Sequence, residues 1–133
     1  MIEGISHITF VVHDLEKASS FFQDIFDAKE VYSSGEKTFS ISKEKFFQVE
    51  DIWIAIMEGD SLSERTYNHL AFKVSEKDFD TYTKRINNLD LDILNGRSRI
   101  EGEGKSIYFY DYDNHLFEIH TGTLHSRLQA YKE

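Results

Sequence analysis

Residues 6–12 read SHITFVV and residues 68–74 read NHLAFKV, so the second stretch repeats the first 62 positions later. The matched pairs are His7 with His69, Ile8 with Leu70, Phe10 with Phe72, and Val12 with Val74. Both stretches are short and alternate in polarity, which predicts a β-strand at each. A strand that recurs in this way indicates that the chain contains an internal repeat of one structural unit.

An amphipathic helix is predicted directly after each of these strands. The stretch DLEKASSFFQDIFD (14–27) spaces its apolar residues three and four apart and offers Asp14 as its N-cap. The stretch SEKDFDTYTKRINNLD (75–90) has the same spacing, with Ser75 as its cap and a weaker capping-box pattern of Ser75 with Asp78. Each helix is expected to cover one face of a sheet.

Three further strands are predicted after each helix. In the first half they are KEVYSS, TFSIS and DIWIAIME (29–34, 38–42 and 51–58). In the second half they are LDIL, SIYFYD and HLFEIHT (91–94, 106–111 and 115–121). Each half is therefore β-α-β-β-β, and TLHSRLQAYKE (123–133) predicts a terminal helix.

The predicted fold class is α+β, with two tandem βαβββ modules that form mixed sheets. We expect one domain over residues 1–133, with module one at 1–62, module two at 63–122 and a tail helix at 123–133. A half of about 60 residues buries too little apolar surface to be stable alone. The two halves, or two chains, should therefore pack together.

Composition excludes several classes of function. The formal net charge of −9 makes nucleic acid and anionic membrane surfaces unfavourable partners. The chain has no cysteine, which excludes disulfides, thiolate metal ligands and a cysteine nucleophile. No signal peptide or membrane-length apolar run is visible, so we expect a cytoplasmic protein.

A metal site is predicted from three residues that the repeat relates. His7 and His69 occupy equivalent positions, and Glu118 lies inside an apolar strand where the same offset places Ile56 in the first half. Taken singly, each could be a hydrogen-bonded or salt-bridged residue of a sheet. Taken together, two imidazoles and one carboxylate form a facial triad, which leaves coordination positions open and suits Mn²⁺, Fe²⁺, Ni²⁺ or Zn²⁺ in catalysis.

The other histidines are weaker candidates. His120 shares the parity of Glu118 on its strand, which predicts a neighbour or outer-shell partner of that carboxylate. His115 lies in the polar turn DNH, where an exposed side chain is expected. His13 and His125 are predicted to lie on the surface.

The paired modules with their His…His…Glu pattern resemble the vicinal oxygen chelate (glyoxalase/bleomycin-resistance/dioxygenase) superfamily. Within it, SHITF, SKEKFF, ERTYNHLAF, EGEGKSIYFYDYDNHLFEIHTGTL and SRL resemble the fosfomycin-resistance proteins. The resemblance implies a divalent metal, most often Mn²⁺, and a small phosphonate epoxide, fosfomycin, as the substrate. It also implies a homodimer with exchanged modules, in which His7 would face His69 and Glu118 of the other chain.

The segment SKEKFF resembles the water-using branch of this family, in which a glutamate at the position of Glu44 acts as general base. This implies an epoxide hydrolase whose product is a vicinal diol. Three alternatives stay open: a thiol transferase acting on the same epoxide, a dioxygenase of the superfamily, and a non-enzymatic drug-binding module. On composition alone, a solvated charge in KEK is the favoured interpretation of Glu44, and the resemblance is what makes it a candidate base.

The phosphonate requires cationic and hydroxyl partners. Thr9 shares the parity of His7, and Ser106 alternates with Ile107 so that it faces the same side as Tyr108. The candidate contacts are Thr9, Tyr67, Arg99, Lys105, Ser106, Tyr108 and Arg127. Ser106, Tyr108 and Arg127 match contacts implied by the resemblance, whereas Arg97 and Arg99 cannot be told apart. The resemblance also concerns the loop that contains Arg97 and Arg99. In the glutathione-using branch this loop binds potassium, and the nearby Lys105 argues against a potassium ion here.

Overall fold

The computed structural model describes residues 1–97 and 99–132, so Ser98 and Glu133, the last residue of the predicted tail helix, lie outside it. The chain divides into two compact units. One comprises Met1–Ser63 with Tyr112–Asn114, and the other comprises Glu64–Asp111 with His115–Glu133. No helix in the described part of the chain has the length and apolar character needed to cross a bilayer.

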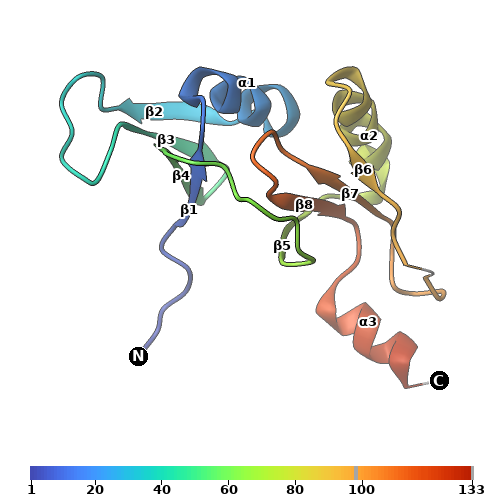
Figure 1. Cartoon of the computed structure of the whole chain (residues 1–133). Helices are drawn as coiled ribbons and strands as arrows, with labels where there is room; N and C mark the ends of the chain where they lie inside the picture. Colours follow the sequence, from blue (N-terminus) through green and yellow to red (C-terminus); the bar gives the residue numbers. More distant parts are fainter. Residues whose placement is uncertain (98, 133) are drawn as a thin grey trace. The chain divides into compact units, whose positions relative to one another are not determined.

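The first unit is a four-stranded mixed sheet with one helix across it (Figure 1). Its elements are β1 (Ile8–Val12), α1 (Leu15–Phe26), β2 (Lys29–Ser33), β3 (Glu44–Val49) and β4 (Ile52–Glu58). The strand order is β1-β4-β3-β2, and β1 runs parallel to β4. The Asp14 carboxylate accepts a hydrogen bond from the Lys17 N–H, which confirms the predicted cap.

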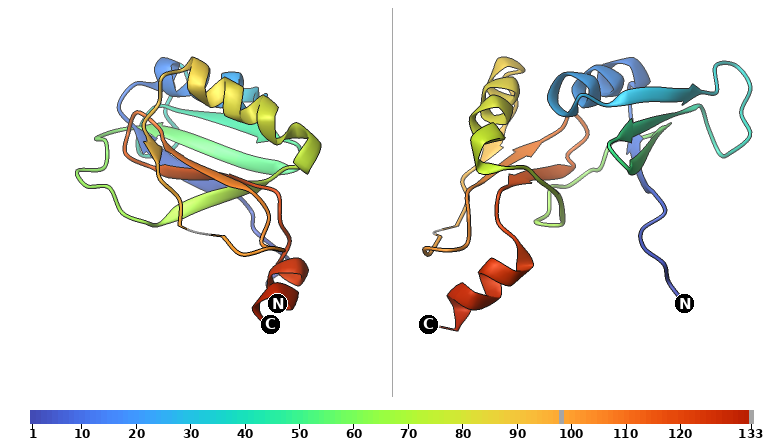
Figure 2. Two further views of the ribbon diagram at one scale, coloured as in Figure 1. Left: turned by 90° about the vertical axis from the view of Figure 1, so that its right-hand side faces the viewer. Right: turned by 180° about the vertical axis from the view of Figure 1, so that it is seen from behind.

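The second unit repeats this topology (Figure 2). Its elements are β5 (His69–Lys73), the 3₁₀ turn η1 (Glu76–Asp78), α2 (Phe79–Asn88), β6 (Ile93–Leu94), β7 (Ser106–Tyr110), β8 (Leu116–His120) and α3 (Leu124–Tyr131). The strand order is β5-β8-β7-β6, and β5 runs parallel to β8. The two predicted βαβββ modules and the tail helix are confirmed.

One predicted strand, TFSIS at 38–42, is wrong. The third strand of this unit is instead β3, which begins only at Glu44. Phe39 and Ile41, in the predicted strand, are 82% and 93% exposed. The reason is the tight β3–β4 turn: Glu50 has a φ of 51°, and Val49 lies opposite Ile52. The residues just before this turn therefore pair with β4. As a consequence, Glu44 opens a buried strand instead of lying in a solvated loop.

The predicted capping box at the second helix is also wrong. The Asp78 N–H donates to the Ser75 carbonyl at 3.1 Å, which forms η1 and uses the amide that a capping box requires. The Ser75 hydroxyl donates instead to the Asp78 carboxylate at 2.9 Å. The α-helix consequently begins only at Phe79.

The counterpart of Glu118 in the first unit is Ala55, not Ile56. Ala55 pairs with Thr9 and Phe46, whereas Glu118 pairs with the equivalent residues Ala71 and Tyr108. The offset changes because the β7–β8 connection is one residue longer than the β3–β4 connection between equivalent pairs. The first sheet thus has a methyl group where the second has a carboxylate.

Candidate active site

The second unit brings His69 and Glu118 together on the neighbouring strands β5 and β8. The His69 Nε2 lies 3.1 Å from the Glu118 Oε1, and the Glu118 side chain is only 5% exposed. The His69 Nδ1 lies 2.7 Å from the carbonyl oxygen of Tyr67. Because a carbonyl can only accept, Nδ1 carries a proton and Nε2 faces the carboxylate. This is the orientation that a metal-binding histidine requires.

The second oxygen of Glu118 is held by two donors. The Ser106 hydroxyl on β7 donates to Oε2 at 2.6 Å, and the Arg99 Nη2 lies 3.5 Å away. A buried carboxylate requires such partners, since an unpaired charge in the interior is costly. Oε1 is thereby left facing His69.

A directed chain of hydrogen bonds continues from Ser106 into α3. The Arg127 guanidinium can only donate, so the His120 Nε2, 3.3 Å away, accepts. The His120 Nδ1 then donates to the Ser106 hydroxyl oxygen at 2.6 Å. Burial, aided by the positive charges of Arg127 and Arg99, lowers the pKa of His120 against the opposing effect of Glu118. His120 is therefore the outer partner of Glu118 that its strand parity predicts.

Arg99 also connects Glu118 to two tyrosines, Tyr108 and Tyr67. The Arg99 Nη2 donates to the Tyr108 hydroxyl at 2.7 Å, and the Tyr67 hydroxyl donates to the same oxygen at 3.2 Å. Burial, followed by the hydrogen bond from Tyr67 and the charge of Glu118, raises the pKa of Tyr108 to about 12. The phenol is thus neutral at physiological pH and can donate to an anion.

Of the two arginines that the sequence leaves open, Arg99 is the one beside Glu118. The Arg97 guanidinium donates instead to Glu103 and, at 3.1 Å, to the Tyr131 hydroxyl. Lys105 is not brought into this group: its side chain is 56% exposed, and its ammonium lies 3.5 Å from the Glu76 carboxylate.

In the first unit, His7, Thr9 and Glu44 belong to the sheet face opposite α1. Thr9 pairs with Ala55, which also pairs with Phe46, and Glu44 lies two residues before Phe46, so alternation puts these side chains on one face. Glu44 is 9% exposed. Its backbone is held by Ser34, whose N–H donates to the Glu44 carbonyl at 3.0 Å.

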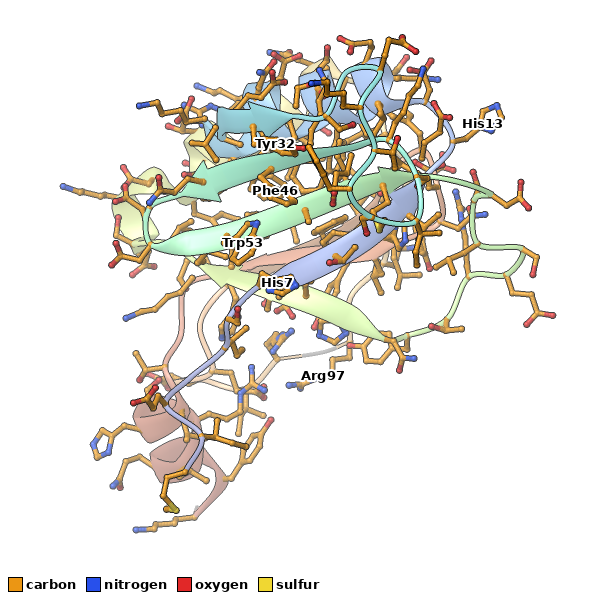
Figure 3. The ribbon with its side chains drawn as sticks, turned by 90° about the vertical axis from the view of Figure 1, so that its left-hand side faces the viewer. His7, His13, Tyr32, Phe46, Trp53 and Arg97 are labelled. Carbon is orange, nitrogen blue, oxygen red and sulfur yellow. The ribbon has the colours of Figure 1, made fainter. Side chains whose placement is uncertain are left out.

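An aromatic row crosses this face and ends at His7 (Figure 3). The ring centroids of His7 and Trp53 lie 4.2 Å apart. The centroid of Trp53 lies 5.1 Å from that of Phe46, which in turn lies 4.8 Å from that of Tyr32. The His7 Nδ1 lies 2.9 Å from the Ser6 hydroxyl. His7 is thus supported by packing on its own sheet.

Within the described residues of one chain, no three His, Cys, Asp or Glu side chains form a group able to hold a metal ion. His69 and Glu118 supply two converging atoms in the second unit. His7 belongs to the first unit. The three residues together have the nitrogen and oxygen chemistry of a facial triad, so the donor set fits a divalent metal.

The predicted exposure of His115 is wrong. Its side chain is 12% exposed, and its Nδ1 lies 2.8 Å from the Asp111 carboxylate. The turn folds back on itself because the His115 N–H also donates to Asp111 at 2.8 Å. His13 and His125 are exposed, as predicted.

The buried Glu103 is absent from the sequence-derived candidates. It is 1% exposed and bonds to Arg97 and Arg99. A signal was present in the pattern Gly-Glu-Gly, since Gly102 and Gly104 have φ values of 94° and 87°. Such backbone angles favour glycine and aim the intervening side chain inward here.

A family model, the glyoxalase/bleomycin resistance protein/dioxygenase superfamily, matches residues 4–119. The fosfomycin resistance protein FosX of Listeria innocua is 59% identical over 131 residues, with 98% of each chain covered. The chain belongs to the FosX-type members of this superfamily.

Solved FosX structures share the fold. A crystal structure of a FosX variant from Listeria monocytogenes, complexed with Mn(II) and 1S,2S-dihydroxypropylphosphonic acid, has a TM-score of 0.90 and 60% identity. The alignment covers 97% of this chain and 99% of that one. The FosX-type chain is also similar to the metallothiol transferase FosB of Bacillus licheniformis, at 38% identity over 135 residues, which cover 98% of this chain and 83% of FosB. The predicted superfamily and its water-using branch are confirmed.

Proposed function

We propose that this protein is a Mn²⁺-dependent hydrolase that adds water to the epoxide of fosfomycin and thereby confers resistance to the drug. The observation that carries the proposal is its similarity to a FosX structure that holds Mn(II) and a dihydroxypropylphosphonic acid. Addition of water to an epoxypropylphosphonate leaves two hydroxyl groups, whereas addition of a thiol leaves one hydroxyl and one thioether.

His7, His69 and Glu118 are the proposed metal ligands. This is supported by the His69 Nε2 and the Glu118 Oε1, which face each other at 3.1 Å. The other ring nitrogen of His69 and the other carboxylate oxygen of Glu118 already have hydrogen-bond partners. When bound, the metal would supply positive charge at the epoxide oxygen, where negative charge develops as the C–O bond breaks.

The phosphonate is proposed to lie against Arg99, with Tyr108 as the hydroxyl donor. Ser106, Tyr67, Thr9 and Arg127 are proposed as further contacts. Arg99 suits this role because its planar guanidinium can donate two parallel hydrogen bonds to one anion. The neutral Tyr108 phenol can add a third. Lys105 would have to exchange its contact with Glu76 for the phosphonate.

Glu44 is the proposed general base. Water is a weak nucleophile at neutral pH, so a carboxylate must take its proton while the new C–O bond forms. The epoxide C–O bond breaks in the same step, and protonation of its oxygen completes the diol. Support for Glu44 comes from its burial at the start of β3 and from its backbone, which Ser34 holds on both sides.

The active form is proposed to be a homodimer with exchanged modules, in which His7 of one protomer meets His69 and Glu118 of the other. The proposal follows from the sequence resemblance and from the small core that each unit of about 60 residues can build. A cytoplasmic location is part of the same proposal and rests on the sequence alone.

The outer partner His120 provides a test of metal binding. We expect His120→Phe to weaken Mn²⁺ affinity about 10- to 100-fold, because the Ser106 hydroxyl would lose the donor that orients it toward Glu118. Titration followed by the electron spin resonance of free Mn²⁺ measures the effect. The exposed His125→Phe serves as a control and should keep wild-type affinity. An unchanged Mn²⁺ affinity in the His120 variant would contradict the role of the hydrogen bonds that link Arg127, His120 and Ser106 to Glu118.

A thiol transferase is the second candidate, because FosB proteins are similar over nearly the whole chain. The deciding experiment incubates the Mn²⁺-loaded protein with fosfomycin in the absence of thiol and follows the ³¹P spectrum. We expect diol formation at a rate that glutathione does not change, and no turnover after chelation of the metal. Product that forms only with added thiol would assign the protein to the transferases instead.

A further inference from the structure

Glu103 is a buried carboxylate that the proposed reaction does not use. It lies in the loop between β6 and β7 and is 1% exposed. Its oxygens accept hydrogen bonds from Arg97 at 2.5 Å, from Arg99 at 3.3 Å, from the Ile100 N–H at 3.1 Å and from the Tyr131 hydroxyl at 3.0 Å. The bond from Arg97, aided by those from Ile100 and Tyr131, lowers its pKa to about 2 against the opposing effect of burial.

The backbone around Glu103 is held by a close approach of two glycines. A Cβ at Gly104 would lie 2.6 Å from the nitrogen of Gly122, which is the second residue after β8. Gly104 also has a φ of 87°, which other residues rarely adopt. The Lys105 N–H donates to the Thr121 hydroxyl at 2.9 Å in the same region. The loop is therefore anchored to the strand that carries Glu118.

The two terminal nitrogens of Arg99 have different partners, and Glu103 is the partner of one of them. The Arg99 Nη1 is directed to Glu103, whereas Nη2 is directed to Tyr108 at 2.7 Å and to Glu118 at 3.5 Å. Since a guanidinium is planar, a partner on one nitrogen sets the direction of the other. Without Glu103, the Arg99 guanidinium would be held only through Nη2 and could rotate about that contact, out of the orientation that the Glu103 bond sets.

We propose that Glu103 is a positioning residue of the substrate site, which holds the Arg99 guanidinium in the orientation that binds the phosphonate. Tyr131 connects this arrangement to α3, because its hydroxyl bonds to both Glu103 and Arg97. The inference rests on the proposed function, in which Arg99 contacts the phosphonate.

Electrostatics and positioning predict opposite results when this charge is removed. Glu103 lies beside two arginines, so its neutralisation raises the local positive potential and, by itself, would strengthen the binding of a phosphonate anion. Loss of positioning would weaken that binding, because Arg99 would no longer be held beside Tyr108. The sign of the change in affinity therefore distinguishes the two effects.

The test uses the Mn²⁺-loaded full chain and the variant Glu103→Gln. We expect the KM for fosfomycin to rise about tenfold, a loss in the range that misplaced binding groups cause, while kcat changes less than about threefold. Mn²⁺ affinity should stay at the wild-type value, since Ser106 still holds Glu118. Calorimetric titration with dihydroxypropylphosphonic acid should show the same loss of affinity without turnover.

Two control variants complete the design. Glu101→Gln removes the same charge from an exposed position two residues away and should leave the KM unchanged. Tyr131→Phe keeps the carboxylate but removes one of its donors, so its KM should rise less than that of the Glu103 variant. An unchanged or lower KM in Glu103→Gln would overturn the proposal. Parallel losses of Mn²⁺ affinity, kcat and thermal stability would also overturn it, since they indicate a general structural role.

The calorimetric measurement separates the two hypotheses. If the wild-type protein does not hydrolyse fosfomycin, the proposed function fails. The binding of the diol phosphonate to the wild type and to Glu103→Gln would still report whether Glu103 positions Arg99. Equal affinities in that case overturn the inference, and weaker binding by the variant supports it.

Discussion

Replacing Glu44 by glutamine is expected to reduce the hydration of fosfomycin by about 10²- to 10⁴-fold, the range that general base catalysis contributes. Glutamine has the shape of glutamate but cannot take a proton from the attacking water. Mn²⁺ and fosfomycin should still bind, because neither the proposed ligands nor the phosphonate contacts change. The ³¹P spectrum measures the rate, and spin resonance of free Mn²⁺ measures the metal affinity.

The control for this variant is Glu36→Gln, which changes the same group on a side chain that is 93% exposed. It should retain full activity. A thiolate needs no general base, so thiolate added at high concentration should still open the epoxide in the Glu44 variant. Wild-type hydration in Glu44→Gln would show that another group activates the water.

The second large effect is expected for Glu118→Ala, which should abolish specific Mn²⁺ binding and, with it, hydrolysis. Mn²⁺ at 100 times its Kd stabilises a protein that binds it by about 2.7 kcal/mol, so the wild type should melt at a higher temperature when the metal is added. The variant should melt at the same temperature with and without Mn²⁺. Circular dichroism should show the same fold, because β8 pairs with β5 and β7 through its backbone, whereas the Glu118 carboxylate bonds to the side chains of Ser106 and Arg99.

Glu64→Ala, at an exposed position, is the matched control and should keep the thermal shift. A persistent shift in Glu118→Ala would remove this residue from the metal site. Mixing Glu118→Ala with His7→Ala tests which chain supplies each ligand. If the ligands come from two protomers, random exchange restores about a quarter of the sites, since half of the dimers are mixed and each has one intact site. If one chain supplies all three, mixing restores nothing.

Much of the fold could be predicted because its signals are local. The helix α1 follows from the apolar spacing of residues 15–26 and from the Asp14 cap, both of which act within one or two turns. The repeated strand before each helix predicts the second module from the first. The pairing of β7 with β8 likewise depends on short strands joined by a polar turn.

Other features depended on register. The strand β3 could not be separated from the apolar alternation at 38–42, because the turn at Glu50 decides which residues meet β4. The counterpart of Glu118 shifted from Ile56 to Ala55 because one extra residue in a connection moves every later pair. An offset counted along the chain does not record such changes.

The sequence by itself determined the two βαβββ modules, the family resemblance and the residue types of the candidate site. Only the tertiary structure decided that Arg99 rather than Arg97 lies beside Glu118, that His120 and Ser106 orient that carboxylate, and that Glu103 is buried. The physical reason is that patterns of polarity arise from neighbours within a few residues. The orientation of a charged side chain is set instead by partners that the folded chain brings from distant positions.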